Sequence, residues 1–296
     1  MKKVLLVALC VGSSFGSEFQ FGAGTFTMEG GFLGLTNSID NDVVTYSVGT
    51  RHSNFGKNFF YGYDLTWYDS KDLIQAQQTY NNLARGFQIP EMEYRVKGLD
   101  ANIRVGYDVL HQDQDNYLGV GVLVGISTPW IDTTKSDNTA PSLNSFSSNF
   151  RGMVNAKDLF DKSETDVLTY KLGATLSFSH SLISNKLSIY GVTSYAYQTG
   201  TIENDYAKSD FDVDGTFQEY NIGFYFTPFT TTFKWGFLTL SPRIYATLGY
   251  RYSKWSVDKM VIDISGANFD SNTLAPFEKE FEMSSSIGYF GVGYSF

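Results

Sequence analysis

Residues 99–109 alternate apolar and polar side chains without a break, and this pattern limits the fold more than any other feature of the chain. One face carries Leu99, Ile103 and Val105, whereas the other carries Asp100 and Arg104. Successive side chains of a β-strand point to opposite faces, so a repeat of two residues predicts a strand with two different surroundings. A helix would repeat every 3.6 residues, and the segment does not fit that period.

The same alternation recurs along the chain. It is clear at 59–67, 118–126, 168–178, 220–226 and 244–252, and weaker at 18–28, 42–52, 187–198 and 281–296. Among the weaker segments, 18–28 and 187–198 do not separate into two clean faces. The pattern predicts an all-β fold with about ten antiparallel strands, and eight or twelve strands are the alternatives.

Composition removes several other classes of protein. The longest apolar run, Val4 to Val11, is far shorter than the roughly 20 residues that a membrane-spanning helix needs. Aromatic residues make up 17% of the 296 positions, which argues against disorder. The net charge of −9 and the lack of a basic stripe argue against nucleic-acid binding.

The first 16 residues have the pattern of a secretory signal peptide. Lys2 and Lys3 precede the apolar run, and Ser14 and Gly16 supply small residues before a cleavage site. We expect residues 1–16 to be removed and residues 17–296 to form one domain; the alternative for 1–16 is a first buried strand. Removal would also take away Cys10, the single cysteine of the chain.

The predicted connections alternate in length. Short links fall at 53–58, 110–116, 179–186 and 228–236, and long links fall at 29–41, 69–92, 127–163, 199–215 and 254–276. Transmembrane β-barrels have short turns on one side and long loops on the other. A soluble sandwich is the alternative, but strands of about ten residues favour a membrane barrel. We therefore expect a transmembrane, antiparallel, up-and-down barrel with five long extracellular loops.

The end of the chain places an apolar or aromatic residue at every second position, at Phe290, Val292, Tyr294 and Phe296. This ending resembles the terminal strand of Gram-negative outer-membrane β-barrel proteins. The resemblance implies that these four residues form an assembly signal for the barrel-assembly machinery. It also implies a location in the outer membrane, among lipid and lipopolysaccharide. The last nine residues carry it specifically and residues 17–296 more loosely, so it identifies a superfamily and not a member.

Charged residues on the polar faces are the candidates for the barrel lumen. Five acids and five bases fall there in the predicted register: Arg51, Asp64, Asp100, Arg104, Asp108, Lys171, Glu219, Arg243, Arg251 and Glu282. A slip of one residue would move all of them into hydrocarbon, where Arg or Lys costs about 2–4 kcal/mol each. We therefore expect the inner charges to specify the register strongly.

Ten strands lie near the size at which side chains fill a barrel. Opposed charges could pair across the lumen and plug it, or they could line a narrow polar pore. The first functional hypothesis is a non-enzymatic outer-membrane protein with surface loops and a narrow passive pore for small solutes or ions. The second is a structural barrel or adhesin with a plugged lumen, whose loops bind an extracellular ligand of unknown identity. The 127–163 loop suits either hypothesis.

The sequence gives little support for catalysis. Barrel proteases of the omptin type resemble this chain in size and strand number, and they use an Asp/His constellation at the extracellular rim. The three histidines here, His52, His111 and His180, all fall beside the predicted short turns. An essential base would therefore be missing at that rim. We predict no catalytic residue and no cofactor, and an outer-membrane enzyme is the distant alternative.

Asp210, Asp212 and Asp214, followed by Gly215, resemble the first half of a calcium-binding loop. Asn221 stands where that loop needs a bidentate Glu, and a strand follows instead of a helix. We therefore predict no EF-hand. A looser surface calcium site and a solvated acidic loop are the alternatives.

Overall fold

The structure is a computed structural model of the chain. It describes residues 17–294 without 33–34, 51–52, 56–57, 72, 76–77, 81–86, 90–91, 111–115, 137–163, 184–185, 205–208, 229–230, 236–237, 241–243, 265–266 and 271–280. In this part of the chain, no helix is long and apolar enough to cross a membrane.

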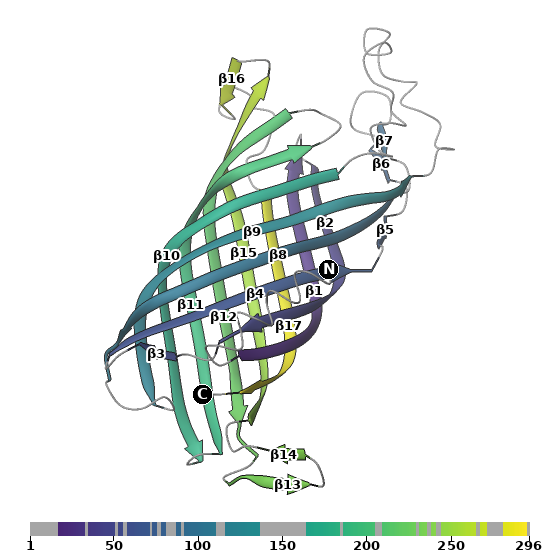
Figure 1. Cartoon of the computed structure of the whole chain (residues 1–296). Coiled ribbons are helices and arrows are strands. Elements are labelled where there is room, and N and C mark those ends of the chain that lie inside the picture. Colours follow the sequence, from purple (N-terminus) through teal and green to yellow (C-terminus); the bar gives the residue numbers. More distant parts are fainter. Residues whose placement is uncertain are drawn as a thin grey trace.

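Ten long antiparallel strands form one closed sheet (Figure 1). In chain order they are β1 (Ser17–Phe32), β2 (Leu35–Gly49), β4 (Phe59–Ser70), β8 (Met92–Asp108), β9 (Tyr117–Ser136), β10 (Glu164–Ile183), β11 (Leu187–Asn204), β12 (Ser209–Phe226), β15 (Ile244–Ile264) and β17 (Phe281–Tyr294). Each strand pairs with the next, and β17 pairs with β1 to close the cylinder. The predicted ten-stranded, up-and-down barrel is confirmed.

The described residues also form seven short strands outside the ten long ones (Figure 1). Three extend the main sheet: β3 (Ser53–Phe55) pairs with β4, β5 (Leu73–Gln75) pairs with β8, and β16 (Ala267–Asp270) folds back on β15. The others form two small hairpins, β6 (Gln78–Tyr80) with β7 (Phe87–Ile89), and β13 (Phe233–Trp235) with β14 (Leu238–Leu240).

Several segments predicted to be long loops are strands instead. β1 and β2 stay paired as far as Phe32 and Leu35, so 29–32 and 35–41 are strand and not loop. Likewise β11 and β12 stay paired as far as Asn204 and Ser209, within the predicted 199–215 loop. β9 covers the first part of 127–163, and β15 covers much of 254–276. The prediction failed because these segments lack the pattern of apolar residues outside and polar residues inside.

The two faces of the sheet exchange polarity along the barrel axis, as β1 shows. Phe19 and Phe21 point outward and are about half exposed, whereas Glu18, directly before Phe19, points inward and is buried. Further along the same strand, Phe26 and Met28 point inward and are buried. The apolar face is therefore outside over one part of the barrel and inside over the other. This exchange explains why 18–28 did not separate into two clean faces.

The outer apolar band surrounds the barrel where the inner face is polar. Its exposed side chains come from neighbouring strands all around the cylinder: Phe19, Phe21, Tyr46, Ile103, Val105, Val120, Val122, Val124, Leu172, Leu176, Ile222, Phe224, Leu248, Phe290 and Val292. An outward apolar band around a closed sheet is the arrangement with which β-barrels meet lipid.

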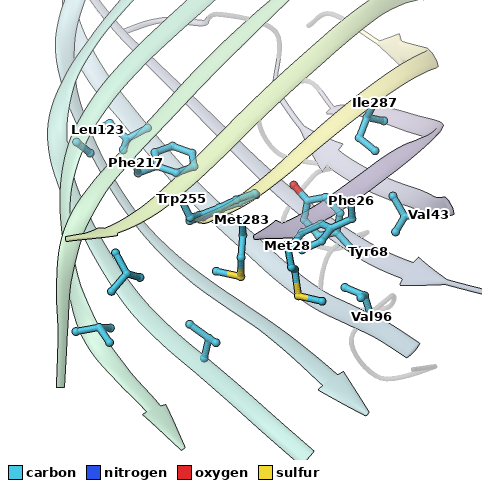
Figure 2. Close-up of a cluster of buried hydrophobic side chains, with 14 residues drawn as sticks. Phe26, Met28, Val43, Tyr68, Val96, Leu123, Phe217, Trp255, Met283 and Ile287 are labelled. Carbon is cyan, nitrogen blue, oxygen red and sulfur yellow. The ribbon is translucent and has the colours of Figure 1, made fainter. Parts of the chain in front are cut away.

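Inside the barrel, apolar side chains pack in one cluster, as Figure 2 shows. The ring of Trp255 lies 5.9 Å from that of Phe26 and 5.5 Å from that of Phe217, measured between centroids. Met28 and Met283 extend the same cluster, and all five side chains are buried. We call this cluster the apolar layer; it packs like the core of a soluble protein.

Candidate functional site

A set of buried charges crosses the lumen beside the apolar layer. We call it the charged layer, and it consists of Asp64, Asp100, Arg104, Lys171, Glu219 and Arg251. The guanidinium of Arg104, on β8, forms ion pairs with Asp64 on β4 and with Glu219 on β12. Three strands separate β8 from β12 in the sheet, so the second ion pair spans the lumen.

Arg251 reaches into the same layer from β15. It donates hydrogen bonds to Thr66 Oγ1 at 2.6 Å and to Gln20 Oε1 at 3.1 Å. Its Nε lies 3.9 Å from a carboxylate oxygen of Glu219, and its guanidinium carbon lies 5.6 Å from the ring centre of Tyr289. Arg251 therefore links four strands through a single side chain.

Lys171 completes the layer from β10. Its ammonium forms an ion pair with Asp100 and lies 4.0 Å from the ring centre of Phe217, in the apolar layer. The amide of Asn102 donates to Asp100 at 2.9 Å and to Asp64 at 3.0 Å, which joins this pair to the Arg104 pairs. The charges thus form one connected network and not three separate pairs.

The side chains of this network are largely buried. Lys171 and Glu219 are each 2% exposed, and Arg104 and Arg251 are below 10%. Buried charges are tolerated where they are paired and hydrogen-bonded, and the lumen supplies both conditions here. The apolar layer lies on one side of the network, and four tyrosines lie on the other.

These tyrosines, Tyr190, Tyr225, Tyr245 and Tyr289, form the tyrosine layer. The rings of Tyr190 and Tyr225 stack with their centroids 4.1 Å apart, and the hydroxyls of Tyr190 and Tyr289 share a hydrogen bond. The Tyr289 hydroxyl also lies 2.6 Å from Asn221 Oδ1. The layer therefore packs as one aromatic unit with paired hydroxyls.

A cavity of about 80 Å³ lies between the charged layer and the tyrosine layer. It is lined by side chains and glycines from around the barrel, among them Glu18, Gly62, Asp64, Arg104, Ser177, Asn221 and Arg251. We call it the chamber. Its walls combine these polar groups with apolar ones such as Phe60 and Val192.

The fold agrees with one class of solved structures. Over 95% of this chain and 97% of the other, the barrel is similar to the outer membrane protease OmpT from Escherichia coli, with a TM-score of 0.52 and 8% identity. The chain therefore has the same type of fold as that outer-membrane β-barrel. It also aligns with the translocator domain of the autotransporter NalP from Neisseria meningitidis. That alignment covers 100% of this chain and 95% of the other at 11% identity, with a TM-score of only 0.35. No family model and no curated protein matches the sequence.

Six of the ten residues predicted to line the lumen meet in the charged layer. Asp108 also points inward and is buried, but it accepts hydrogen bonds from the backbone nitrogens of Leu110 and Leu118 and so supports the turn between β8 and β9. Arg51 and Arg243 lie outside the described residues.

The prediction that Glu282 lines the lumen is wrong. Met283 and Ser285, on β17, point inward and are buried, which places Glu282 on the outer face of that strand. Its carboxylate lies 2.8 Å from the ammonium of Lys254, on β15, and both side chains are partly exposed. This part of β17 lies beyond the outer apolar band, so a charge on the outer face does not meet hydrocarbon.

One buried acid of the barrel, Glu18, was not predicted to line the lumen. Glu18 is 3% exposed and accepts hydrogen bonds from Thr247 at 2.6 Å and from Gln20 at 2.7 Å. It was overlooked because the polarity of β1 reverses and the strand shows no single polar face. The outward positions of Phe19 and Phe21, taken alone, would have placed Glu18 and Gln20 in the lumen.

Of the other predicted positions, those whose side chains the structure describes lie away from the lumen. His180 is exposed on the outer face of β10, and His52 and His111 lie outside the described residues. Asp212 and Asp214 belong to the outer face of β12, and the side chain of Asp210 is not described. Among the described residues, no group of three His, Cys, Asp or Glu could hold a metal ion.

Three of the four residues of the predicted assembly signal lie on β17. Phe290 and Val292 point outward and are about half exposed, and Tyr294 is half-buried on the same face. Phe296 lies outside the described residues. The alternation predicted for the end of the chain is therefore present over residues 290–294.

Proposed function

We propose that the chain is an integral protein of the Gram-negative outer membrane whose lumen is sealed, and that it acts through its extracellular surface. One observation carries this proposal: Arg104 is paired across the lumen with Asp64 and Glu219, between two buried layers of apolar and tyrosine side chains. A passive pore needs a continuous polar path, and the apolar layer offers none to a hydrated solute. The narrow pore is therefore the less favoured candidate.

The fold and the outer apolar band support a location in the outer membrane. Lipid and lipopolysaccharide are the partners that this location implies. We also propose that the barrel-assembly machinery recognises Phe290, Val292 and Tyr294, together with Phe296, during insertion. The outward direction of Phe290 and Val292 supports this role, because an assembly factor would meet them before the sheet closes.

We propose that the barrel is not an enzyme. The protein with the similar fold is a protease, but at 8% identity the likeness extends to the fold alone. His180, the one histidine that the structure describes, is on the outer face and away from the charged layer. Hydrolysis of a peptide library by the purified barrel would contradict this part of the proposal.

Conductance in planar lipid bilayers tests the sealed lumen. We expect the folded wild-type barrel to show no stable current steps, and Lys254→Gln, which changes only an outer-face pair, to behave in the same way. Stable steps in the wild type, altered in size by Arg104→Gln or Arg251→Gln but not by Lys254→Gln, would show instead that the lumen is a pore lined by the charged layer.

A further inference from the structure

The chamber contains buried hydrogen-bond donors that the rest of the barrel leaves unused. Arg104 uses its two terminal nitrogens for Asp64 and Glu219, and Arg251 uses its own for Thr66 and Gln20. The Nε atoms of both arginines have no hydrogen bond among the described residues.

The hydroxyl of Ser177, which is 3% exposed, has no partner there either. Ser177 and both arginines line the chamber. A buried donor without a partner is costly, so groups of this kind indicate that something accepts hydrogen bonds from them.

The charges around the chamber decide which kind of ligand fits. A small anion would accept from both arginines, but it would also face the carboxylates of Glu18 and Asp64 in the same walls. A cation would suit those carboxylates, but it would face Arg104 and Arg251. Like charges brought together in a buried site repel strongly. A neutral molecule that both accepts and donates hydrogen bonds satisfies all four groups.

We propose that the chamber is a built site for ordered water, which accepts hydrogen bonds from the two arginine Nε groups and from Ser177 and donates to the carboxylates. A volume of about 80 Å³ has room for about two or three water molecules. The charged layer is then dry on the side of Trp255 and hydrated on the side of the tyrosines. Water in the chamber would be a ligand bound inside the lumen. This proposal does not depend on whether the barrel acts through its extracellular surface.

Two serines on β10 give a matched pair of variants. Ser177 and Ser179 both point inward, are 3% exposed and lack a hydrogen-bond partner among the described residues, but Ser177 lines the chamber and Ser179 does not. We expect Ser177→Val to lower the midpoint of thermal unfolding by several degrees, because a water molecule loses its partner. We expect Ser179→Val to leave the midpoint unchanged or raise it. Equal effects of the two variants would overturn the proposal.

Two glycines provide a second test that does not remove a polar group. A methyl group added at Gly62 points into the chamber, with Thr50 Oγ1 nearest at 3.9 Å, and one added at Gly288 points outward, with the Ala23 carbonyl oxygen nearest at 4.0 Å. Both Gly→Ala changes stiffen a strand by the same amount. A hydrated chamber predicts a lower midpoint for Gly62→Ala than for Gly288→Ala, because the methyl group displaces water. A dry chamber predicts an equal or higher midpoint for Gly62→Ala, which would contradict the proposal.

A crystal structure that resolves ordered water examines the site directly. We expect electron density within hydrogen-bond distance of both Nε atoms and of Ser177 Oγ, and no anomalous peak in the chamber after crystals are soaked in sodium bromide. A bromide peak would show that the site takes an anion, and an empty chamber would show that it is dry. Either result would refute bound water while leaving the sealed lumen intact, whereas current steps through a hydrated barrel would refute the sealed lumen alone.

Discussion

The hydroxyl oxygens of Ser47, on β2, and Thr66, on β4, lie 3.0 Å apart across the shortest pairing between the ten long strands of the described barrel. β2 and β4 pair over seven residues, whereas β1 and β17, which close the cylinder, pair over fourteen. β4 ends at Ser70 while β2 continues to Leu35, so the two strands separate towards one end. Because Arg251 also donates to Thr66, the charged layer ties this short seam to the far side of the barrel.

The barrel should therefore open first between β2 and β4. A disulfide between Ser47→Cys and Thr66→Cys should raise the midpoint of thermal unfolding, followed by the mobility shift between folded and unfolded forms on gels. The control is Thr175→Cys with Ser194→Cys, a directly opposed pair with the same 3.0 Å separation of hydroxyls on the β10–β11 seam, which pairs over eighteen residues. A rise as large for the control as for the β2–β4 disulfide would argue against early opening there.

Removal of one charge from the lumen should be far more damaging than removal of one from the outer surface. Arg104→Gln leaves Asp64 and Glu219 buried without their ion pair, a change that typically costs about 3–5 kcal/mol. Lys254→Gln breaks the partly exposed pair with Glu282, and such pairs contribute about 0–1 kcal/mol. Urea unfolding in lipid vesicles measures both variants. Similar losses of stability would mean that Arg104 is solvated and not sealed in.

The exchange of polarity along β1 predicts that a lysine on the outer face costs different amounts of stability at different heights. Phe21→Lys places a charge in the apolar band and should cost about 2–4 kcal/mol if that position lies near the middle of the membrane. Thr25→Lys, further along the strand and beyond the band, should cost about 0–1 kcal/mol. The yield of folded barrel in vesicles compares the two variants. Equal tolerance of both would place the membrane elsewhere.

Trp255 should behave as a core residue although it sits inside a membrane barrel. It is 2% exposed, contacts Phe26 and Phe217, and donates a hydrogen bond to Ser127 at 2.9 Å. Trp255→Ala should therefore lower the free energy of unfolding by about 3–5 kcal/mol. Ile222→Ala, on the outer face, loses contacts with lipid and should have a smaller effect in the same unfolding assay. A negligible loss for Trp255→Ala would show that the apolar layer is loosely packed.

The strands could be predicted where one face stays apolar throughout, as in 99–109 and 118–126. Prediction failed where the outer face becomes polar, because a strand with Thr and Asp outside and Phe or Met inside has the opposite polarity from the rest of the barrel. For this reason 29–41 was mistaken for a loop and Glu282 was placed in the lumen. The register was predictable for strands with one clean apolar face, but the height at which the polarity reverses was not.

The partners within the charged layer could not be predicted either. Arg104, Asp64 and Glu219 were each assigned to the lumen from their own strands, but alternation does not say which residues share a height. That height depends on the tilt and stagger of all ten strands. The contact between Arg104 and Glu219 joins residues 115 positions apart, and no local pattern links them.

Spin labels on the outer face of β15 test whether the barrel is apolar outside where it is charged inside, and whether this polarity reverses further along the strand. Single cysteines at Leu248, Tyr250, Lys254 and Ser256 would carry the labels in lipid vesicles. We predict that oxygen dissolved in the lipid relaxes the labels at 248 and 250, and that a water-soluble relaxing agent reaches those at 254 and 256. If the water-soluble agent reached 248 and 250 equally well, the outer band would not face lipid and the account would be wrong.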